Sequence, residues 1–270
     1  MRRLAVLLAA VVTLVVGVPG AAQAAPAYPT SVGAVGDSIT RGFDATLWGC
    51  FLSDCPAYSF STGTSSSVPS HLRRLRAAQP GLTVTAANTA RTGAKVAELD
   101  VQLAALPGGV QYVTVLIGAN DVCTSSASTM TSVDTFRAEF GSAVNGYLST
   151  HPNTRLFVSS IPNVYKLWSL FRSSSSAQNT WRTFGICQSM LASSNTETQR
   201  QTVLTREKAF NSIMAEVCGA WTAQCKWDQG ATFDHAFVRS DVSTVDYFHP
   251  SVSGQGTLAN LTWAKSWWTA

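Results

Sequence analysis

Short apolar runs alternate with amphipathic stretches along the chain. The apolar runs are rich in valine and end at glycine, asparagine or proline, which is typical of buried strands. The stretches between them carry apolar residues three and four positions apart, which predicts helices. We expect strands at residues 31–35, 82–87, 112–117 and 155–160, and helices at 68–79, 94–106, 133–148, 202–217 and 256–268. This alternation predicts an α/β fold with a parallel sheet covered on both faces.

The segment from Lys166 to Asn195 interrupts this pattern. Its stretch 172–180 is polar and contains four consecutive serines, Ser173 to Ser176, which predicts a loop. The whole segment is too short to bury a core of its own. We therefore expect a single domain with one long, partly irregular excursion that Cys187 ties down.

The N-terminus has the pattern of an export signal. Positive charges at Arg2 and Arg3 precede an apolar run from Leu4 to Val18, and Ala22-Gln23-Ala24 fits a signal peptidase site. The apolar run is shorter than the ~20 residues that a membrane-spanning helix needs, which disfavours a retained anchor, and no later segment is long and apolar enough to span. We expect a signal peptide at residues 1–24, a secreted protein and a domain at residues 25–270.

The net charge and the distribution of basic residues bear on whether the chain binds nucleic acid. The formal net charge is +4, and Arg2 and Arg3 of the signal peptide supply two of these charges. Nucleic-acid-binding proteins cluster lysine and arginine, and this chain has no basic block. The composition therefore disfavours a nucleic-acid partner.

Six cysteines lie in the expected mature chain. An even number in an exported protein predicts three disulfides. The close pairs Cys50/Cys55 and Cys218/Cys225 indicate two small loops, which leaves Cys123 with Cys187. The alternative, a zinc site, requires C-x-x-C or clustered histidine spacing, which is absent from the sequence.

Four short blocks carry residue types suited to catalysis, and three of them follow expected strands. Residues 36–38 are Gly-Asp-Ser, residues 88–93 run from Asn to Gly, residues 118–121 are Gly-Ala-Asn-Asp, and residues 246–249 are Asp-Tyr-Phe-His. Each block alone is equally typical of ordinary turns. Ligands bind at the carboxyl ends of strands in parallel sheets, so the first three blocks are expected at one edge.

The fourth block identifies the candidate histidine. Asp246 and His249 lie three positions apart on one short loop, so the carboxylate can orient the imidazole. The other histidines, at positions 71, 151 and 235, occupy an expected helix, a turn and an apolar stretch. We therefore favour His249 over His235.

The four blocks together, in this order from Val32 to Pro250, resemble those of the SGNH hydrolases, also called GDSL esterases and lipases. Ile39 stands where the GDSL motif has leucine. The resemblance implies a three-layer flavodoxin-like fold. It also implies Ser38 as nucleophile, His249 as general base, Asp246 as its partner, and an oxyanion hole made by Ser38, Gly93 and Asn120. It implies no metal and no organic cofactor.

The substrate is less constrained than the reaction. The segment Ile117–Cys123 resembles secreted lipases and phospholipases of the A and B types. Aromatic residues follow the nucleophile and populate the excursion, at positions 48, 51, 58, 60, 168, 171, 181 and 184. They can contact an acyl chain or a lipid surface, or form core. We expect a monomer that hydrolyses lipid esters; a carbohydrate O-acetyl esterase and a non-catalytic binding module are the alternatives.

Overall fold

The computed structural model describes residues 25–269. The expected signal peptide lies outside these residues. Five strands form one parallel sheet in the order β2-β1-β3-β4-β5. The strands are β1 (Ser31–Gly36), β2 (Thr85–Asn88), β3 (Tyr112–Leu116), β4 (Arg155–Val158) and β5 (Cys225–Trp227). This order is that of flavodoxin-like folds, so the expected α/β class and single domain are confirmed.

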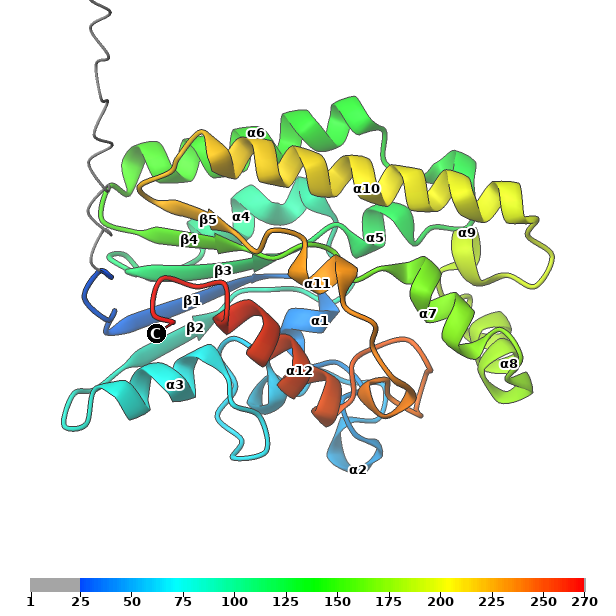
Figure 1. Cartoon of the computed structure of the whole chain (residues 1–270), viewed down its shortest axis with the longest axis horizontal. Coiled ribbons are helices and arrows are strands. Elements are labelled where there is room, and N and C mark those ends of the chain that lie inside the picture. Colours follow the sequence, from blue (N-terminus) through cyan, green and yellow to red (C-terminus); the bar gives the residue numbers. More distant parts are fainter. Residues whose placement is uncertain (1–24, 270) are drawn as a thin grey trace, which may run out of the picture.

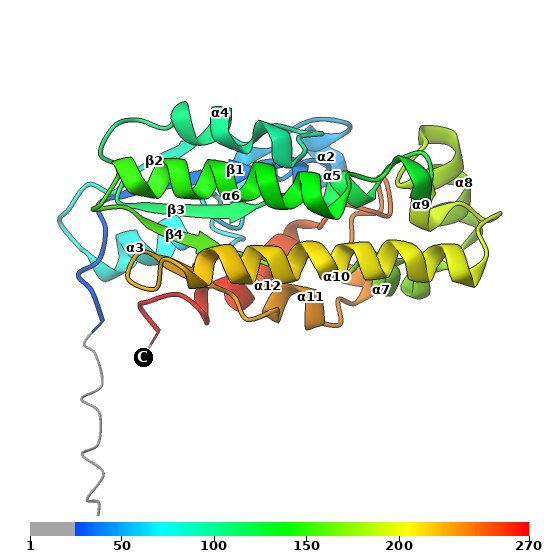
Figure 2. The ribbon, with the colours of Figure 1, turned by 90° about the horizontal axis from the view of Figure 1, so that it is seen from above.

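Helices cover both faces of the sheet, which gives three layers (Figures 1 and 2). On one face lie α4 (Leu99–Ala104), α6 (Val133–Thr150) and α10 (Glu197–Gly219). On the other lie α3 (His71–Ala78) and α12 (Val252–Trp263). The shorter helices are α1 (Ser38–Arg41), α2 (Leu47–Cys50), α5 (Ala119–Val122) and α11 (Ala231–Asp234). No helix among the described residues is long and apolar enough to span a membrane.

The central strand β3 is buried along its whole length, and its side chains alternate between two cores. Val113 and Val115 belong to the large cluster that α4, α6 and α10 help to form. Tyr112 belongs to a second cluster with Leu72 and Leu75 of α3. This alternation is the period of two expected for a strand between two helical layers.

His71 belongs to the second core rather than to a reactive site. Its side chain is fully buried, and its two ring nitrogens hydrogen-bond Tyr112 Oη at 2.7 Å and Thr262 Oγ1 at 2.8 Å. Burial lowers the pKa of His71 to about 3, so its imidazole is neutral at ordinary pH. His71 thus joins α3, β3 and α12 by structural hydrogen bonds.

The loop prediction for residues 172–180 is wrong, because most of this stretch is helical. The excursion forms α7 (Val164–Phe171), α8 (Ser175–Phe184) and α9 (Gln188–Leu191). The Ser174 hydroxyl accepts a hydrogen bond from the N–H of Ala177 and thus caps α8. Ala177 and Trp181 lie four positions apart and are both buried, so one face of α8 packs on the core.

Three disulfides join the six cysteines in the expected pairs: Cys50–Cys55, Cys123–Cys187 and Cys218–Cys225. Cys123 directly follows α5, and Cys187 directly precedes α9. The second bridge therefore fixes the excursion to the loop after β3. The third bridge holds the end of α10 against β5, a strand of three residues that the hydrophobic pattern did not predict.

Candidate active site

The candidate nucleophile follows β1 through a turn that only glycine accommodates. Gly36 has φ of 143°, and a Cβ atom there would lie 2.1 Å from the carbonyl oxygen of Leu116. The Gln102 side chain accepts from the Gly36 N–H at 2.7 Å and donates to its carbonyl at 2.9 Å. Asp37 Oδ1 accepts from the N–H of Ile39 at 2.9 Å and so caps α1. These contacts place Ser38 at the carboxyl edge of the sheet.

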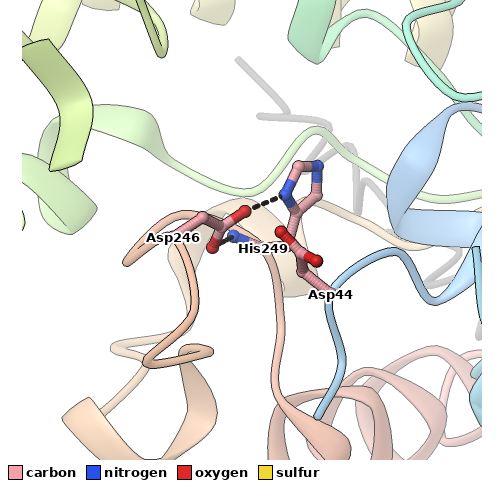
Figure 3. Close-up of side chains that lie close together, drawn as sticks. All are labelled: Asp44, Asp246 and His249. Carbon is pink, nitrogen blue, oxygen red and sulfur yellow. Dashed lines mark hydrogen bonds and ion pairs between the residues drawn. The ribbon is translucent and has the colours of Figure 1, made fainter. Parts of the chain in front are cut away.

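A chain of hydrogen bonds links the three candidate triad residues. The Ser38 hydroxyl lies 2.7 Å from His249 Nε2. His249 Nδ1 is in turn bonded to Asp246 Oδ2, as Figure 3 shows. With the proton on Nδ1, the imidazole donates to the carboxylate and Nε2 accepts from the serine. Nothing in the sequence spacing shows that Ser38 lies beside His249, and the fold brings the two residues together.

The loop between β5 and α12 holds the acid in place. Asp246 Oδ1 accepts hydrogen bonds from the backbone N–H groups of Phe248 at 2.9 Å and His249 at 3.0 Å. Tyr247, between Asp246 and Phe248, has φ of 56°, the left-handed conformation that turns the chain back on itself. The carboxylate is therefore fixed before it contacts the imidazole.

The charges of the pair are interdependent. Burial by itself lowers the pKa of His249, but the charge and hydrogen bond of Asp246, together with the charges of Asp37 and Asp44, outweigh burial, and the pKa is raised overall. Burial by itself raises the pKa of Asp246, but the charge and hydrogen bonds of His249 outweigh it and the pKa is lowered. The pair therefore stabilises an imidazolium beside a carboxylate, the charge state that a general base reaches after taking a proton.

Asn120 and Gly93 lie in adjoining loops. The Asn120 side chain donates from Nδ2 to the carbonyl oxygen of Ala94 at 3.0 Å, directly beside Gly93. An amide nitrogen has two N–H groups, so one remains for another acceptor. Gly93 has φ of 84°, and a Cβ there would meet no atom within 4 Å, so this position opens onto free space.

Asp121 couples the same two loops, a role that the motif alone did not indicate. This buried carboxyl group accepts from the N–H of Val96 at 2.9 Å and from Thr131 Oγ1 at 2.7 Å. Burial raises the pKa of Asp121 to about 6. The Asn-Asp pair thus combines one side chain that reaches toward the Gly93 loop with another that holds this loop in position.

Two further residues lie beside the imidazole, and no sequence motif marks either of them. The Phe43 ring lies with its centroid 5.0 Å from that of His249. The Asp44 carboxyl group is buried, and it forms a group with Asp246 and His249 whose ligand-type atoms all lie within 4.8 Å of one another. Both residues belong to the loop after α1, which matches no catalytic motif.

Such a group has the composition of a metal site, but both nitrogens of its imidazole are already hydrogen-bonded. Both ring nitrogens of His249 take part in the serine and aspartate contacts. A divalent ion would have to displace one of these contacts to bind the imidazole. The arrangement therefore suits proton transfer better than metal ligation.

The family model described as GDSL-like Lipase/Acylhydrolase matches residues 32–262. The chain belongs to this family. It is accordingly a GDSL-type ester hydrolase in class, as the four sequence blocks predicted. A search of curated proteins found no match to this GDSL hydrolase.

Solved structures show the same fold. The extracellular lipase from Streptomyces rimosus aligns at a TM-score of 0.51 and 15% identity, over 87% of this GDSL hydrolase and 99% of that chain. Phospholipase A1 from Streptomyces albidoflavus NA297 aligns at 0.53 and 14%, over 88% and 100%. An acetylxylan esterase from Geobacillus stearothermophilus, a catalytic mutant, aligns at 0.52 and 17%, over 89% and 96%. At such identities the likeness concerns the fold.

Proposed function

We propose that this chain is a secreted serine hydrolase of carboxylic esters, with Ser38 as nucleophile, His249 as general base and Asp246 as the acid that orients it. The hydrogen-bond chain from Ser38 through His249 to Asp246 carries the proposal. Backbone N–H groups hold Asp246, and hydrogen bonds then connect it through the imidazole to the serine, so the three groups are positioned for reaction before substrate arrives. A purely binding role gives no reason for this arrangement, which argues against the non-catalytic alternative.

The reaction is acyl transfer to water. His249 Nε2 takes the proton of the Ser38 hydroxyl as its oxygen attacks the ester carbonyl carbon. The C–O bond to the alcohol then breaks, and the alcohol leaves with the proton from His249. Water adds to the resulting acyl-enzyme by the same route, which releases the acid and restores the serine. The proton of Ser38 thus leaves with the alcohol, and a proton of the attacking water, carried by His249, restores the serine hydroxyl.

The oxyanion of each tetrahedral intermediate is assigned to three donors. They are the backbone N–H groups of Ser38 and Gly93 and the remaining N–H of Asn120. The contact between Asn120 and the Gly93 loop supports this assignment, because it fixes two of the donors relative to each other. Fixed donors stabilise charge that develops only in the transition state. The proposed steps use protein groups alone.

An apolar pocket beside the triad supports a substrate with a fatty acyl chain. Its lining includes Ile39, Ala119 and Phe248, the immediate neighbours of Ser38, Asn120 and His249. Eleven of its fourteen lining residues are apolar, and they come from α1, α5, α7, the His249 loop and α12. A pocket of this character gains affinity from burying hydrocarbon rather than from hydrogen bonds to sugar hydroxyls.

An exposed apolar loop supports contact with a lipid surface. Leu47, Trp48, Phe51 and Leu52 expose 52%, 85%, 57% and 47% of their surface, although the Cys50–Cys55 disulfide holds their backbone. Residues 45–53 carry no charge, so nothing opposes their entry into an apolar phase. Among the aromatic residues for which the sequence left both roles open, Phe60, Phe171 and Trp181 are buried in the core and do not contribute to such a surface.

We extend the proposal to hydrolysis of phospholipid acyl esters by a secreted monomer. Three disulfides support an extracellular location, because such bonds persist in oxidising compartments. The rival is an O-acetyl esterase of carbohydrates, which the likeness to an acetylxylan esterase supports. The two differ in acyl chain length, because an acetyl group buries much less apolar surface than a fatty acyl chain does in an apolar pocket.

The proposal is tested by activity with graded esters and by labelling of the nucleophile. Wild-type protein should hydrolyse nitrophenyl esters from acetyl to palmitoyl, release fatty acid from phosphatidylcholine in excess chelator, and react with an organophosphonate at Ser38. Ser38→Ala should lose at least about 10³-fold in kcat without unfolding. Ser128→Ala, which changes an exposed serine, is the matched control and should remain active.

Two outcomes would contradict the proposal at different levels. Near-normal turnover by folded Ser38→Ala would remove the triad. Activity limited to acetyl esters, or to acetylated sugars, would keep the triad and replace the lipid substrate by the carbohydrate one.

A further inference from the structure

A second carboxyl group lies beside the imidazole of the triad. Asp44 follows α1, its side chain is fully buried, and its oxygens lie within 4.8 Å of the ligand-type atoms of Asp246 and His249. Figure 3 shows the Asp44 carboxyl group next to the His249 ring, on a different segment of chain from Asp246. The mechanism proposed above uses only Asp246, so the presence of a second acid requires a separate explanation.

The backbone holds Asp44 firmly against the histidine loop. Its φ of 53° lies in the left-handed region, which few residues other than glycine, asparagine and aspartate adopt. Its N–H donates to the carbonyl of Ser53 at 3.2 Å, and its carbonyl accepts from Ser243 Oγ at 2.6 Å. The N–H of Ser243 in turn donates to the carbonyl of His249 at 2.8 Å. Ser243 therefore connects the backbone of Asp44 to the backbone of His249.

The two carboxyl oxygens of Asp44 have different surroundings. Oδ1 accepts a hydrogen bond from the N–H of Leu52 at 2.5 Å, whereas Oδ2 is buried without a hydrogen-bond partner. The hydrogen bond that holds the loop at Leu52 uses only Oδ1, so it does not account for the buried Oδ2. Among residues 25–269 no lysine or arginine forms an ion pair with Asp44, and the nearby Arg41 pairs with Asp54. The cation within reach of this buried acid is the imidazolium form of His249.

We propose that Asp44 is a positioning residue whose carboxylate stabilises the imidazolium of His249 and so sets the pH at which hydrolysis begins. This inference rests on the ester-hydrolase function proposed above. A buried charge is stable only when an opposite charge lies close to it. Asp44 meets this condition when His249 has taken the proton of the nucleophile, as happens during attack on the ester.

Three acids act on the imidazole from three segments. Asp246 belongs to the same loop as His249, Asp37 to the nucleophile turn and Asp44 to the loop after α1; the remaining neighbours are the Phe43 and Phe248 rings. Burial lowers the pKa of His249, and the three negative charges together raise it above its usual value. Burial, followed by the charge of Asp246, raises the pKa of Asp44 to about 6, so Asp44 is ionised in neutral solution.

These charges determine in which direction the pKa of His249 moves when Asp44 is replaced. Removing the Asp44 charge lowers the pKa of His249, so the imidazole becomes a neutral base at lower pH. Asp44→Asn should therefore move the acidic limb of the kcat/KM profile to lower pH by roughly one unit. The plateau kcat should fall about three- to tenfold, because the imidazolium loses one stabilising neighbour.

Asp44→Asn is a suitable variant because asparagine has the same shape, tolerates the left-handed backbone and retains an oxygen for the Leu52 N–H. The control is Asp100→Asn, which makes the same change in net charge at an exposed position on α4. The imidazole pKa of His249, followed by NMR on the folded proteins, gives a second readout that needs no activity. It should fall in Asp44→Asn and stay unchanged in Asp100→Asn.

The experiments test the role of Asp44 separately from the proposed ester-hydrolase function. If folded Asp44→Asn keeps both the acidic limb and the imidazole pKa of wild type, Asp44 is only a brace and the inference is wrong. If Asp44→Asn does not fold, Asp44→Gly replaces it, since glycine relieves the left-handed conformation, and the same two results decide. Wild-type protein that hydrolyses no ester would overturn the proposed function, and the NMR titration would still test the contact.

Discussion

Gly36 shows why a short motif predicts so much about the nucleophile. The position before Asp37 must have positive φ and must pass within 2.1 Å, measured from a hypothetical Cβ, of the carbonyl of Leu116. Any side chain there would displace β1 from β3 or remove Ser38 from the edge of the sheet. A local motif is predictable from sequence because a local steric requirement produces it.

Asp246 and His249 were predictable for a similar reason, whereas Asp44 was not. Three positions of separation within one turn allow only a few geometries, so their contact follows from spacing. Asp44 reaches the imidazole across 205 residues of sequence, through a left-handed turn held by Ser243. Nothing local marks such a contact, because it exists only when β1 and the last loop meet at the same edge.

Asn120 provides a prediction at this scale. Asn120→Ala should lower kcat by roughly 10²–10³, with a smaller change in KM, because its free N–H acts on the oxyanion and not on the ground state. Its second contact, to the carbonyl of Ala94, predicts some loosening of the Gly93 loop as well. Steady-state kinetics on a soluble short-chain ester measure both constants.

The matched control for this variant is Asn195→Ala, which removes another half-buried asparagine that donates to backbone carbonyls, those of Gln188 and Ser189. It should leave kcat nearly unchanged. If Asn120→Ala changes mainly KM, Asn120 binds the substrate and does not stabilise the transition state.

Among the elements, α8 shows where reasoning from composition failed. A run of serines disfavours the interior of a helix, but Ser174 acts as a cap, and Ser175 begins the helix. The burial of Ala177 and Trp181 then outweighs the weak helix propensity of the polar positions. Turn-forming residues at the end of a helix are indistinguishable by composition from those of a loop, so only the spacing of two buried residues signals the helix.

The exposed loop that contains α2 leads to a second prediction. Trp48→Ser should reduce hydrolysis of phosphatidylcholine vesicles about tenfold and change hydrolysis of a soluble butyryl ester less than twofold. Burying an aromatic side chain in the lipid contributes roughly 1.5–3 kcal/mol to surface binding, and the soluble ester does not use this contact. Vesicle co-sedimentation should show the same loss of binding.

Leu82→Ser is the control, because Leu82 is 60% exposed but precedes β2, at the opposite end of the sheet from the triad. It should leave both activities intact. Equal losses on vesicles and on the soluble ester in Trp48→Ser would show that the loop supports the site and does not contact the lipid.

For the whole molecule, the layer arrangement was predictable and the last strand was not. The alternation of valine-rich runs with helical periods indicated a parallel sheet, and with the order β2-β1-β3-β4-β5 right-handed crossovers place helices on both of its faces. β5 escaped because its three residues, Cys225–Trp227, are too few to show a period. The site forms at the carboxyl edge between the parallel strands β1 and β3. The connection after β1 leads to β2 on one side, and the connection after β3 leads to β4 on the other, and ligands bind at this position in other open α/β sheets.

Buried acids give the molecule a pH-dependent stability. Burial raises the pKa of Asp37 to about 7 and that of Asp121 to about 6, from an ordinary value of 3.8. The folded protein thus holds these protons more tightly than the unfolded chain, so their stabilising contribution is complete below pH 4 and is lost as pH rises through 6 and 7. The raised pKa of His249 acts in the same direction above its unfolded value of 6.5.

Asp246 acts in the opposite direction, but in another pH range. Its pKa is lowered, so its contribution is complete above about pH 4 and is lost only in stronger acid. The lowered pKa of His71 acts against the buried acids up to pH 6.5, because the unfolded imidazole binds a proton that the folded one does not. The raised pKa values of Asp37 and Asp121 together outweigh this effect, so the free energy of unfolding should fall by about 2 kcal/mol between pH 5 and pH 7.5. Urea titrations with the disulfides intact measure this difference.

Asp37→Asn, which cannot ionise, should reduce the fall in the free energy of unfolding, whereas Asp100→Asn at an exposed position should not. If the fall is the same in wild type and in Asp37→Asn, Asp37 does not hold its proton in the folded protein.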